Sequence, residues 1–193
     1  MYARLPITVS TLSLAIFGIA ALAQASPPTR LPSPVGGLES SSQTEIESVE
    51  IREAATRLRR RTGKVSVILF FSTGCSLSQR LFPSFVAMAK EYQPRGVDFL
   101  VFSTDPPGNL QRVAPFLARH GATFKTVHIK PWQSGHFKRA LAPHGIEIGD
   151  MWTKPLVAVR DRNGRVLLQG QGVTNLAPFR TALDDAIGNN RSP

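Results

Sequence analysis

Blocks of apolar residues, each the length of one strand or one helix, recur along the chain from about Thr44 onward. The clearest is the nearly continuous apolar run from Val65 to Phe71, which is typical of a central strand covered on both faces. Two further runs of this kind, Val97 to Ser103 and Thr126 to Ile129, predict two more buried strands.

Segments with apolar residues at helix-like intervals lie before, between and after these strands. They predict helices over residues 44–61, 75–92, 109–120, 134–141 and 175–187. Thr44 is the expected N-cap of the first helix, with Glu47 three residues on. Pro83 lies inside the second helix and removes one backbone donor there, so we expect a kink.

The last third of the chain carries a hairpin signal. Asp161-Arg162-Asn163-Gly164 separates two short apolar runs, and Asn-Gly in that position is typical of a tight β-turn. Strands that alternate with helices pair in parallel, whereas a hairpin adds antiparallel strands. The predicted fold class is therefore α/β: a mixed sheet with a parallel βαβ half, a C-terminal β-hairpin plus helix, and helices on both faces.

The first 25 residues predict an export signal. Arg4 precedes an apolar stretch over residues 9–22, and Ala23-Gln24-Ala25 supplies the small residues that signal peptidase reads. The stretch is too short and too rich in Ser and Thr for a typical membrane span, and an uncleaved anchor is the alternative. We expect a periplasmic protein or, alternatively, one anchored in the inner membrane and facing the periplasm. Residues 26–43, rich in Pro, Ser and Gly, are interpreted as a flexible linker, and residues 44–193 as one domain.

The chain contains a single cysteine, Cys75, although cysteines in an oxidising compartment normally come in pairs. One cysteine excludes a disulfide within the chain and any cysteine-rich zinc cluster. It indicates a free reactive thiol or pairing with another molecule, including a disulfide-linked dimer through Cys75. No cofactor and no metal site is predicted, because the four histidines do not share one face and are interpreted as surface residues: His120, His128, His136 and His144.

The formal net charge is +10, and basic residues concentrate at the end of the first predicted helix. We interpret this run as a solvated helix face. The alternative is a weak contact with an anionic surface through Arg57, Arg59, Arg60 and Arg61. Nucleic acid is not an expected partner of an exported protein.

Cys75 stands where the first buried strand gives way to the second predicted helix. Unpaired N–H groups and the helix dipole at a helix N-terminus stabilise a thiolate relative to a thiol. Cysteines in such settings reach pKa values of about 3.5–7.5. Ser78, one turn further on, is placed to donate a hydrogen bond to that thiolate. Cys75 and Ser78 are therefore the candidate catalytic residues.

Four features in this order resemble the thioredoxin-like superfamily, nearest to its exported bacterial thiol–disulfide interchange branch. Cys75 follows the first buried strand, Pro83 comes eight residues later, Lys154-Pro155 precedes the hairpin, and the hairpin turn ends at Gly164. The resemblance covers roughly residues 44–187. It implies a thioredoxin-like sheet with a cis-proline at Pro155 beside the active-site sulfur.

The resemblance also implies a substrate side. A substrate peptide would add as an extra strand to the extended backbone beside Pro155. The residues expected to contact it are Thr73, Gly74, Lys154 and Pro155.

The chain departs from the family pattern at four positions. Gly74 stands where a tryptophan often precedes the cysteine, and Leu69 where many thioredoxins bury an acidic residue. Lys154 replaces a small or β-branched residue before the proline, and Ser78 replaces the second, resolving cysteine. A mixed disulfide formed by Cys75 therefore has no second thiol in the chain to resolve it, which excludes net two-electron reduction or oxidation by the chain alone.

These observations predict a periplasmic monothiol protein that engages protein or small thiols and disulfides of the cell envelope through Cys75. If it is an enzyme, it is of the thiol–disulfide oxidoreductase or isomerase type. One alternative is a binding or assembly module with the same fold whose redox role has lapsed. A weaker alternative is a one-cysteine peroxidase, suggested by the Ser72-x-x-Cys75 spacing.

Overall fold

The computed structural model describes residues 46–130, 134–149 and 152–188. The predicted export signal, residues 1–25, and the predicted linker, residues 26–43, lie outside these ranges. None of the helices in these ranges combines the length and the apolar character needed to span a bilayer.

The strands of the described region form one six-stranded mixed sheet in the order β1-β4-β3-β2-β5-β6. The first four strands in this order pair in parallel, and β5 and β6 add two antiparallel pairings at the other edge. The strands are β1 (Ser48–Val49), β2 (Ser66–Phe71), β3 (Asp98–Ser103), β4 (Thr126–Ile129), β5 (Leu156–Arg160) and β6 (Val166–Gln171).

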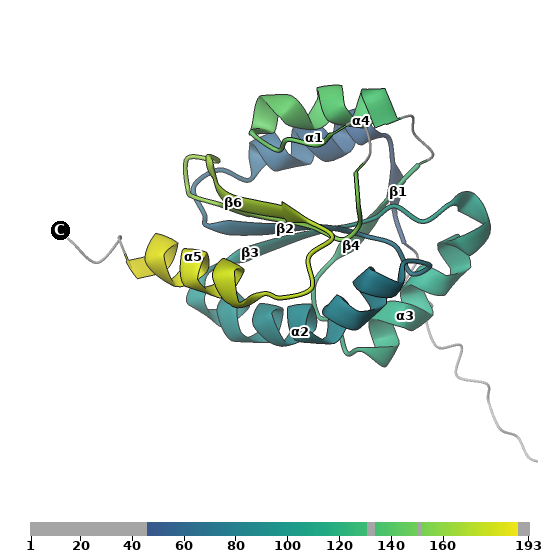
Figure 1. Ribbon diagram of the computed structural model, residues 1–193, viewed down its shortest axis with the longest axis horizontal. Helices are drawn as coiled ribbons and strands as arrows, with labels where there is room; N and C mark the ends of the chain where they lie inside the picture. The colour runs from purple at the N-terminus through teal and green to yellow at the C-terminus, as the bar shows by residue number, and fades with distance from the viewer. Residues whose placement is uncertain (1–45, 131–133, 150–151, 189–193) are drawn as a thin grey trace, which may run out of the picture. The chain divides into compact units, whose positions relative to one another are not determined.

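Helices cover both faces of this sheet (Figure 1). One face is covered by α1 (Ile51–Arg60) and α4 (Ser134–Leu141). The other face is covered by α2 (Ser76–Tyr92), α3 (Val113–Arg119) and α5 (Ala177–Gly188). Three short 3-10 helices complete the described elements: η1 (Gln93–Arg95), η2 (Pro107–Arg112) and η3 (Ala142–His144).

Strand β2 supplies side chains to both hydrophobic cores. Leu69 and Phe71 pack on the side of α2, α3 and α5, whereas Ile68 and Phe70 pack on the side of α1 and α4, because successive strand residues point to opposite faces. Every residue of β2 is buried, which explains its continuous apolar run. The predicted fold class, a mixed α/β sheet with helices on both faces, is confirmed.

The prediction of one helix over residues 44–61 is wrong in its first part. Ser48 and Val49 form strand β1, which pairs in parallel with His128 and Ile129 of β4 at the edge of the sheet. Helix α1 begins only at Ile51, and Thr44 lies outside the described residues. The predicted helix over residues 109–120 is also divided, into the 3-10 helix η2 and the α-helix α3.

A buried arginine ties the hairpin to α1. Arg160 at the end of β5 donates from Nε to the carbonyl of Gly164 (2.8 Å) and from Nη1 to the carbonyl of Leu58 (3.1 Å). Its guanidinium therefore satisfies one carbonyl of the last turn of α1 and one of the hairpin turn. Gly164 itself has a φ of +83°, a conformation that favours glycine.

Candidate functional site

Cys75 is the N-cap residue of α2 and is partly exposed. A three-residue turn, Ser72 to Gly74, connects it to the end of β2. The Cys75 N–H donates to the Ser72 carbonyl (3.1 Å), and the Cys75 carbonyl accepts the N–H of Gln79 (2.9 Å), which opens the helix. The sulfur is thus placed at the N-terminal end of a 17-residue helix.

The surroundings of Cys75 favour its thiolate form. Burial alone raises the pKa of the thiol, but hydrogen bonds from the backbone and side chain of Ser78 and from the backbone of Leu77 lower it, as does the charge of Lys154. The net result is a pKa below that of an ordinary thiol. The helix N-terminus and the hydroxyl of Ser78 therefore act on the sulfur in the direction that the sequence indicates.

Ser78 is part of the turn as well as a neighbour of the sulfur. It is only 1% exposed, and its Oγ accepts the backbone N–H of Ser72 at 3.4 Å. The position of a resolving thiol is therefore occupied by a small buried hydroxyl that also helps to hold the end of β2.

The segment that precedes β5, Thr153 to Pro155, also contacts the Cys75 sulfur. The peptide bond between Lys154 and Pro155 is cis, and the Cys75 thiol donates to the Lys154 carbonyl at 3.5 Å. The neighbouring backbone is already paired, because the Thr153 carbonyl accepts the N–H of Gly172 and the Pro155 carbonyl accepts that of Val173. Among the described residues no hydrogen bond uses the N–H of Lys154.

Aromatic side chains support this segment from the core. Trp152 stacks on Phe137 of α4, with ring centroids 4.8 Å apart, and meets Phe70 of β2 edge-on at 6.5 Å. The Lys154 ammonium lies 5.4 Å from the Trp152 ring centroid, within cation–π range. The position of Lys154 beside the sulfur is thus connected to the packing of the sheet.

One buried residue near the site was missed by the sequence analysis. Asp105, just after β3, accepts hydrogen bonds from the hydroxyls of Ser72, Thr73 and Ser103 and from the backbone N–H of Thr73. Leu69, where the family pattern suggested a buried acid, is a buried apolar residue. The buried acidic residue at this turn, Asp105, therefore follows β3, the strand that pairs in parallel with β2.

The turn residues expected on the substrate side differ in their placement. Thr73 is buried, its hydroxyl and N–H are bound to Asp105, and its carbonyl accepts the side-chain amide of Gln79 at 2.6 Å. Gly74 is exposed beside Cys75. Gly74 and Lys154 are therefore better placed to meet a substrate than Thr73 and Pro155, which are both buried.

Comparison with solved structures identifies the fold. A thioredoxin-family thiol:disulfide interchange protein from Chlorobium tepidum superposes with a TM-score of 0.53 at 22% identity, covering 67% of this chain and 84% of that chain. The fold is thioredoxin-like. A candidate DsbE-type thiol:disulfide interchange protein from the same organism gives 0.50 at 23% identity, over 68% and 85%. An uncharacterised conserved protein from Geobacillus kaustophilus gives 0.53 at 18%, over 69% and 72%.

No family model and no curated protein matches the chain. At these identities the solved structures establish the shared thioredoxin-like fold, and the chemistry of the site has to be argued from its own residues.

One of the four histidines is not on the surface as predicted. Within the described residues no three His, Cys, Asp or Glu side chains are grouped to hold a metal ion. His128 is 2% exposed, with Nε2 at 2.9 Å from the Asp105 carbonyl and Nδ1 at 3.0 Å from the Ser48 hydroxyl. Because a carbonyl only accepts, Nε2 carries a hydrogen and donates it to the Asp105 carbonyl.

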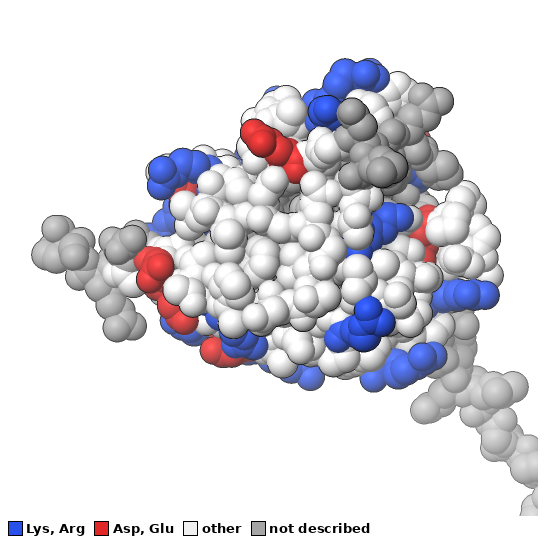
Figure 2. Space-filling model, in the orientation of Figure 1, with Lys and Arg blue, Asp and Glu red and all other residues white. Residues whose placement is uncertain are grey.

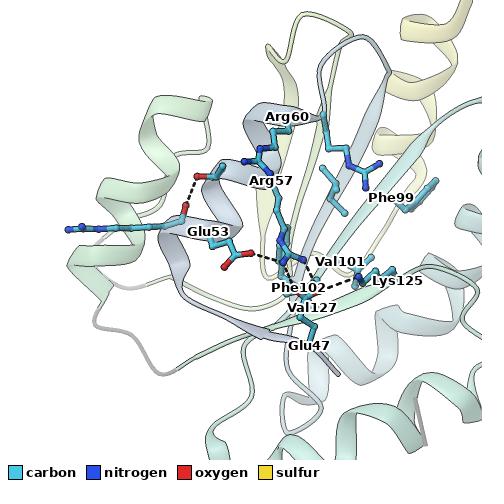
Figure 3. Close-up of a pocket in the computed structure, with 13 residues that line it drawn as sticks. Glu47, Glu53, Arg57, Arg60, Phe99, Val101, Phe102, Lys125 and Val127 are labelled. Carbon is cyan, nitrogen blue, oxygen red and sulfur yellow. Dashed lines mark hydrogen bonds and ion pairs between the residues drawn. The ribbon is translucent and has the colours of Figure 1, made fainter. Parts of the chain in front are cut away.

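The basic residues near the end of α1 are partly neutralised. A groove of about 620 Å³ runs beside α1, and inside it Arg57 pairs with Glu47 and Glu53 (Figure 3). Arg61 pairs with Asp98 at 3.0 Å. Across the face shown in Figure 2, lysine and arginine side chains are spread rather than gathered into one patch.

Proposed function

We propose that this chain is a monothiol thioredoxin-like protein of the bacterial periplasm that exchanges disulfides with thiols and disulfides of envelope proteins through Cys75. The observation that carries the proposal is the placement of the sulfur. It is partly exposed at the N-terminus of α2, its pKa is lowered, and the Lys154 carbonyl lies 3.5 Å from it. Periplasmic location is supported by the predicted export signal, with an inner-membrane anchor as the alternative.

The exchange step follows from the chemistry of a single thiolate. The Cys75 sulfur attacks one sulfur of a substrate disulfide; the new S–S bond joins Cys75 to the substrate, and the displaced sulfur leaves as a thiolate that takes a proton from water. Because Ser78 has no thiol, a second thiol of the substrate, a small thiol or a partner protein must attack this mixed disulfide and release Cys75. One S–S bond forms for each that breaks, so the chain alone isomerises or exchanges disulfides without net redox change.

The direct test measures the reactivity of the thiol. Alkylation of the wild-type protein with iodoacetamide across a pH series should give a pKa clearly below that of an ordinary cysteine. In cells, mixed-disulfide adducts should be trapped on the wild-type protein and disappear in Cys75→Ala. An ordinary thiol pKa together with no Cys75-dependent adducts would contradict the proposal and favour a binding module.

A second test restores the missing thiol. Ser78→Cys places a sulfur one turn from Cys75, and we expect this variant to gain reductase activity on insulin disulfides with a thiol reductant present. Ser84→Cys adds a thiol at an exposed position further along α2 and serves as the matched control, expected to gain none. If Ser78→Cys forms no intramolecular disulfide and remains inactive, the proposed site geometry is wrong.

The peroxidase alternative has less support. The Ser72 hydroxyl, which suggested it, donates to Asp105 at 2.9 Å and accepts the Gly74 N–H at 3.3 Å. It is therefore committed to the turn, and the cation that acts on the sulfur is Lys154.

Binding through the basic helix is supported by one observation. Arg59 and Arg60 are exposed on α1 and form no ion pair within the described residues, whereas Arg57 and Arg61 do. Any weak contact with an anionic surface therefore depends on Arg59 and Arg60. Sedimentation with phosphatidylglycerol vesicles tests this: replacing both by Glu should abolish binding, and Arg112→Glu, an exposed site in η2, should not. Equal binding by all three proteins would exclude this contact.

A further inference from the structure

A buried carboxylate lies next to the turn that carries Cys75. Asp105 is 3% exposed and follows the last residue of β3 by two positions. Within the described chain no lysine or arginine forms an ion pair with it. A buried carboxylate without a counter-charge is costly unless hydrogen bonds replace its water. The groups that provide those bonds therefore indicate what the residue does.

Most of these hydrogen bonds come from two residues of the active-site turn. The hydroxyls of Ser72 and Thr73 donate to Oδ1 at 2.9 and 2.6 Å. The Thr73 N–H lies 2.9 Å from Oδ1 and 3.0 Å from Oδ2, so it is shared between the two oxygens. The Ser103 hydroxyl donates to Oδ2 at 2.8 Å and joins the carboxylate to its own strand.

Ser72 connects Asp105 to the backbone of Gly74 and Cys75 through hydrogen bonds. Its Oγ, which is held by Asp105, accepts the N–H of Gly74 at 3.3 Å, and its carbonyl accepts the N–H of Cys75 at 3.1 Å. Two consecutive hydrogen bonds therefore connect the carboxylate to the backbone of Cys75. The first of the two, from the Ser72 hydroxyl to the carboxylate, is charge-assisted, and such hydrogen bonds are stronger than neutral ones.

We propose that Asp105 is a positioning residue for Cys75: its carboxylate fixes Ser72 and Thr73 so that α2 begins at the cysteine with its first N–H groups directed at the sulfur. The inference rests on the proposed function, because positioning matters only for a sulfur that reacts. Asp105 follows β3, whereas Leu69, the position at which the family pattern places a buried acid, lies in β2. Asp105 acts through the turn and not on the sulfur itself.

The positioning role and a simple charge effect predict opposite results in Asp105→Asn. Loss of a nearby negative charge, by itself, favours the thiolate and lowers the pKa of Cys75. Loss of positioning raises that pKa, because the turn loosens and the helix N–H groups no longer point at the sulfur. An amide cannot replace the carboxylate here, since the Thr73 N–H contacts both oxygens and would face an NH₂ group at one of them.

The test is the pH profile of iodoacetamide alkylation of Cys75 in the full chain. We expect Asp105→Asn to shift the profile to higher pH by about one pH unit, which lowers the alkylation rate about tenfold at a pH below both pKa values. Thr104→Val is the matched control, because Thr104 is also buried and its hydroxyl donates at 2.9 Å to the Phe71 carbonyl, not to Asp105. Both variants should lose stability, but only Asp105→Asn should move the profile.

Ser103→Ala keeps the inference testable if Asp105→Asn does not fold. It removes one of the donors to Oδ2 and should shift the profile in the same direction by less. A profile that is unchanged or moves to lower pH overturns the positioning role. A wild-type protein whose thiol already has an ordinary pKa rejects the proposed function instead, so the two failures are distinguishable.

Discussion

Phe137 of α4 tests how strongly the sheet supports the segment that reaches Cys75. Its ring is fully buried, stacks on Trp152 at 4.8 Å and meets Phe70 edge-on at 5.1 Å. Trp152 comes two residues before Lys154, so this stack fixes the start of the segment beside the sulfur. Phe137→Ala removes a fully buried aromatic side chain, at a cost of about 3–5 kcal/mol that includes the two aromatic pairs.

We expect urea unfolding followed by circular dichroism to show a loss of about 4 kcal/mol in the unfolding free energy of Phe137→Ala, a large part of the roughly 5–15 kcal/mol of a typical domain. Phe137→Leu keeps most of the volume and loses the ring pairs, so it should cost less, about 1–3 kcal/mol. The reasoning is refuted if Phe137→Ala costs less than about 2 kcal/mol, or if both variants cost the same at unchanged m-value.

Four further outcomes follow from the contacts of single residues. Lys154→Gln and Lys154→Glu should shift Cys75 alkylation stepwise to higher pH, because the Lys154 charge lowers the thiol pKa; equal profiles would contradict this. The pKa of the Glu47 carboxyl is lowered to about 2, first by its hydrogen bond to Arg57 and then by that to Lys125. An NMR titration of Glu47 should show this low midpoint, and a midpoint near 4.5 would contradict the pairing. Because the Glu47 pKa is lowered in the folded state, the stabilisation of the fold by its ion pairs is present above pH 4.5 and is lost as the pH falls toward about 2. Gly164→Ala should destabilise the protein by about 1–3 kcal/mol in thermal unfolding. The φ of Gly164 is +83°, and a Cβ there would collide with the buried guanidinium of Arg160. A loss under about 0.5 kcal/mol would exclude this strain. Finally, wild-type Cys75 should react faster with disulfides of longer peptides than with glutathione disulfide. Equal rates at matched disulfide potential would exclude a role for the Lys154 N–H and carbonyl in binding the substrate chain.

Much of the fold could be predicted because its strands are local and strongly apolar. The run from Val65 to Phe71 is buried on both faces, and the segment Thr126 to Ile129 matches β4 at both ends. β1 could not be predicted in the same way, because its two residues become a strand only through pairing with β4. A short segment of this kind has no periodicity of its own, and it cannot be told apart from the start of the helical pattern that follows it.

The candidate site shows the same division between local and distant signals. A sequence motif identifies Cys75, Ser78 and the Lys154-Pro155 peptide. Asp105 lies 30 positions from the cysteine and is part of no such motif. One signal could have found it. β2 and β3 pair in parallel, so their carboxyl ends lie side by side, and polar residues that follow both ends are expected to meet there. Ser103-Thr104-Asp105 follows this pattern.

The hydrogen bond between the Cys75 thiol and the Lys154 carbonyl connects the two halves of the site. In the resting thiol this carbonyl accepts the S–H at 3.5 Å, while no hydrogen bond of the described residues uses the Lys154 N–H. Under the proposed function the thiol loses its proton to water before the attack, because only the thiolate attacks a disulfide, and the S–H donor is then gone. The carbonyl and the N–H of Lys154 are then both available to a bound chain, which is the pair of groups that an added strand needs. A peptide disulfide satisfies both groups with its own backbone, and a small disulfide satisfies them only in part. Under the proposed function, a site with Ser78 in place of a second thiol would select its substrate by holding the partner chain while another thiol completes the exchange.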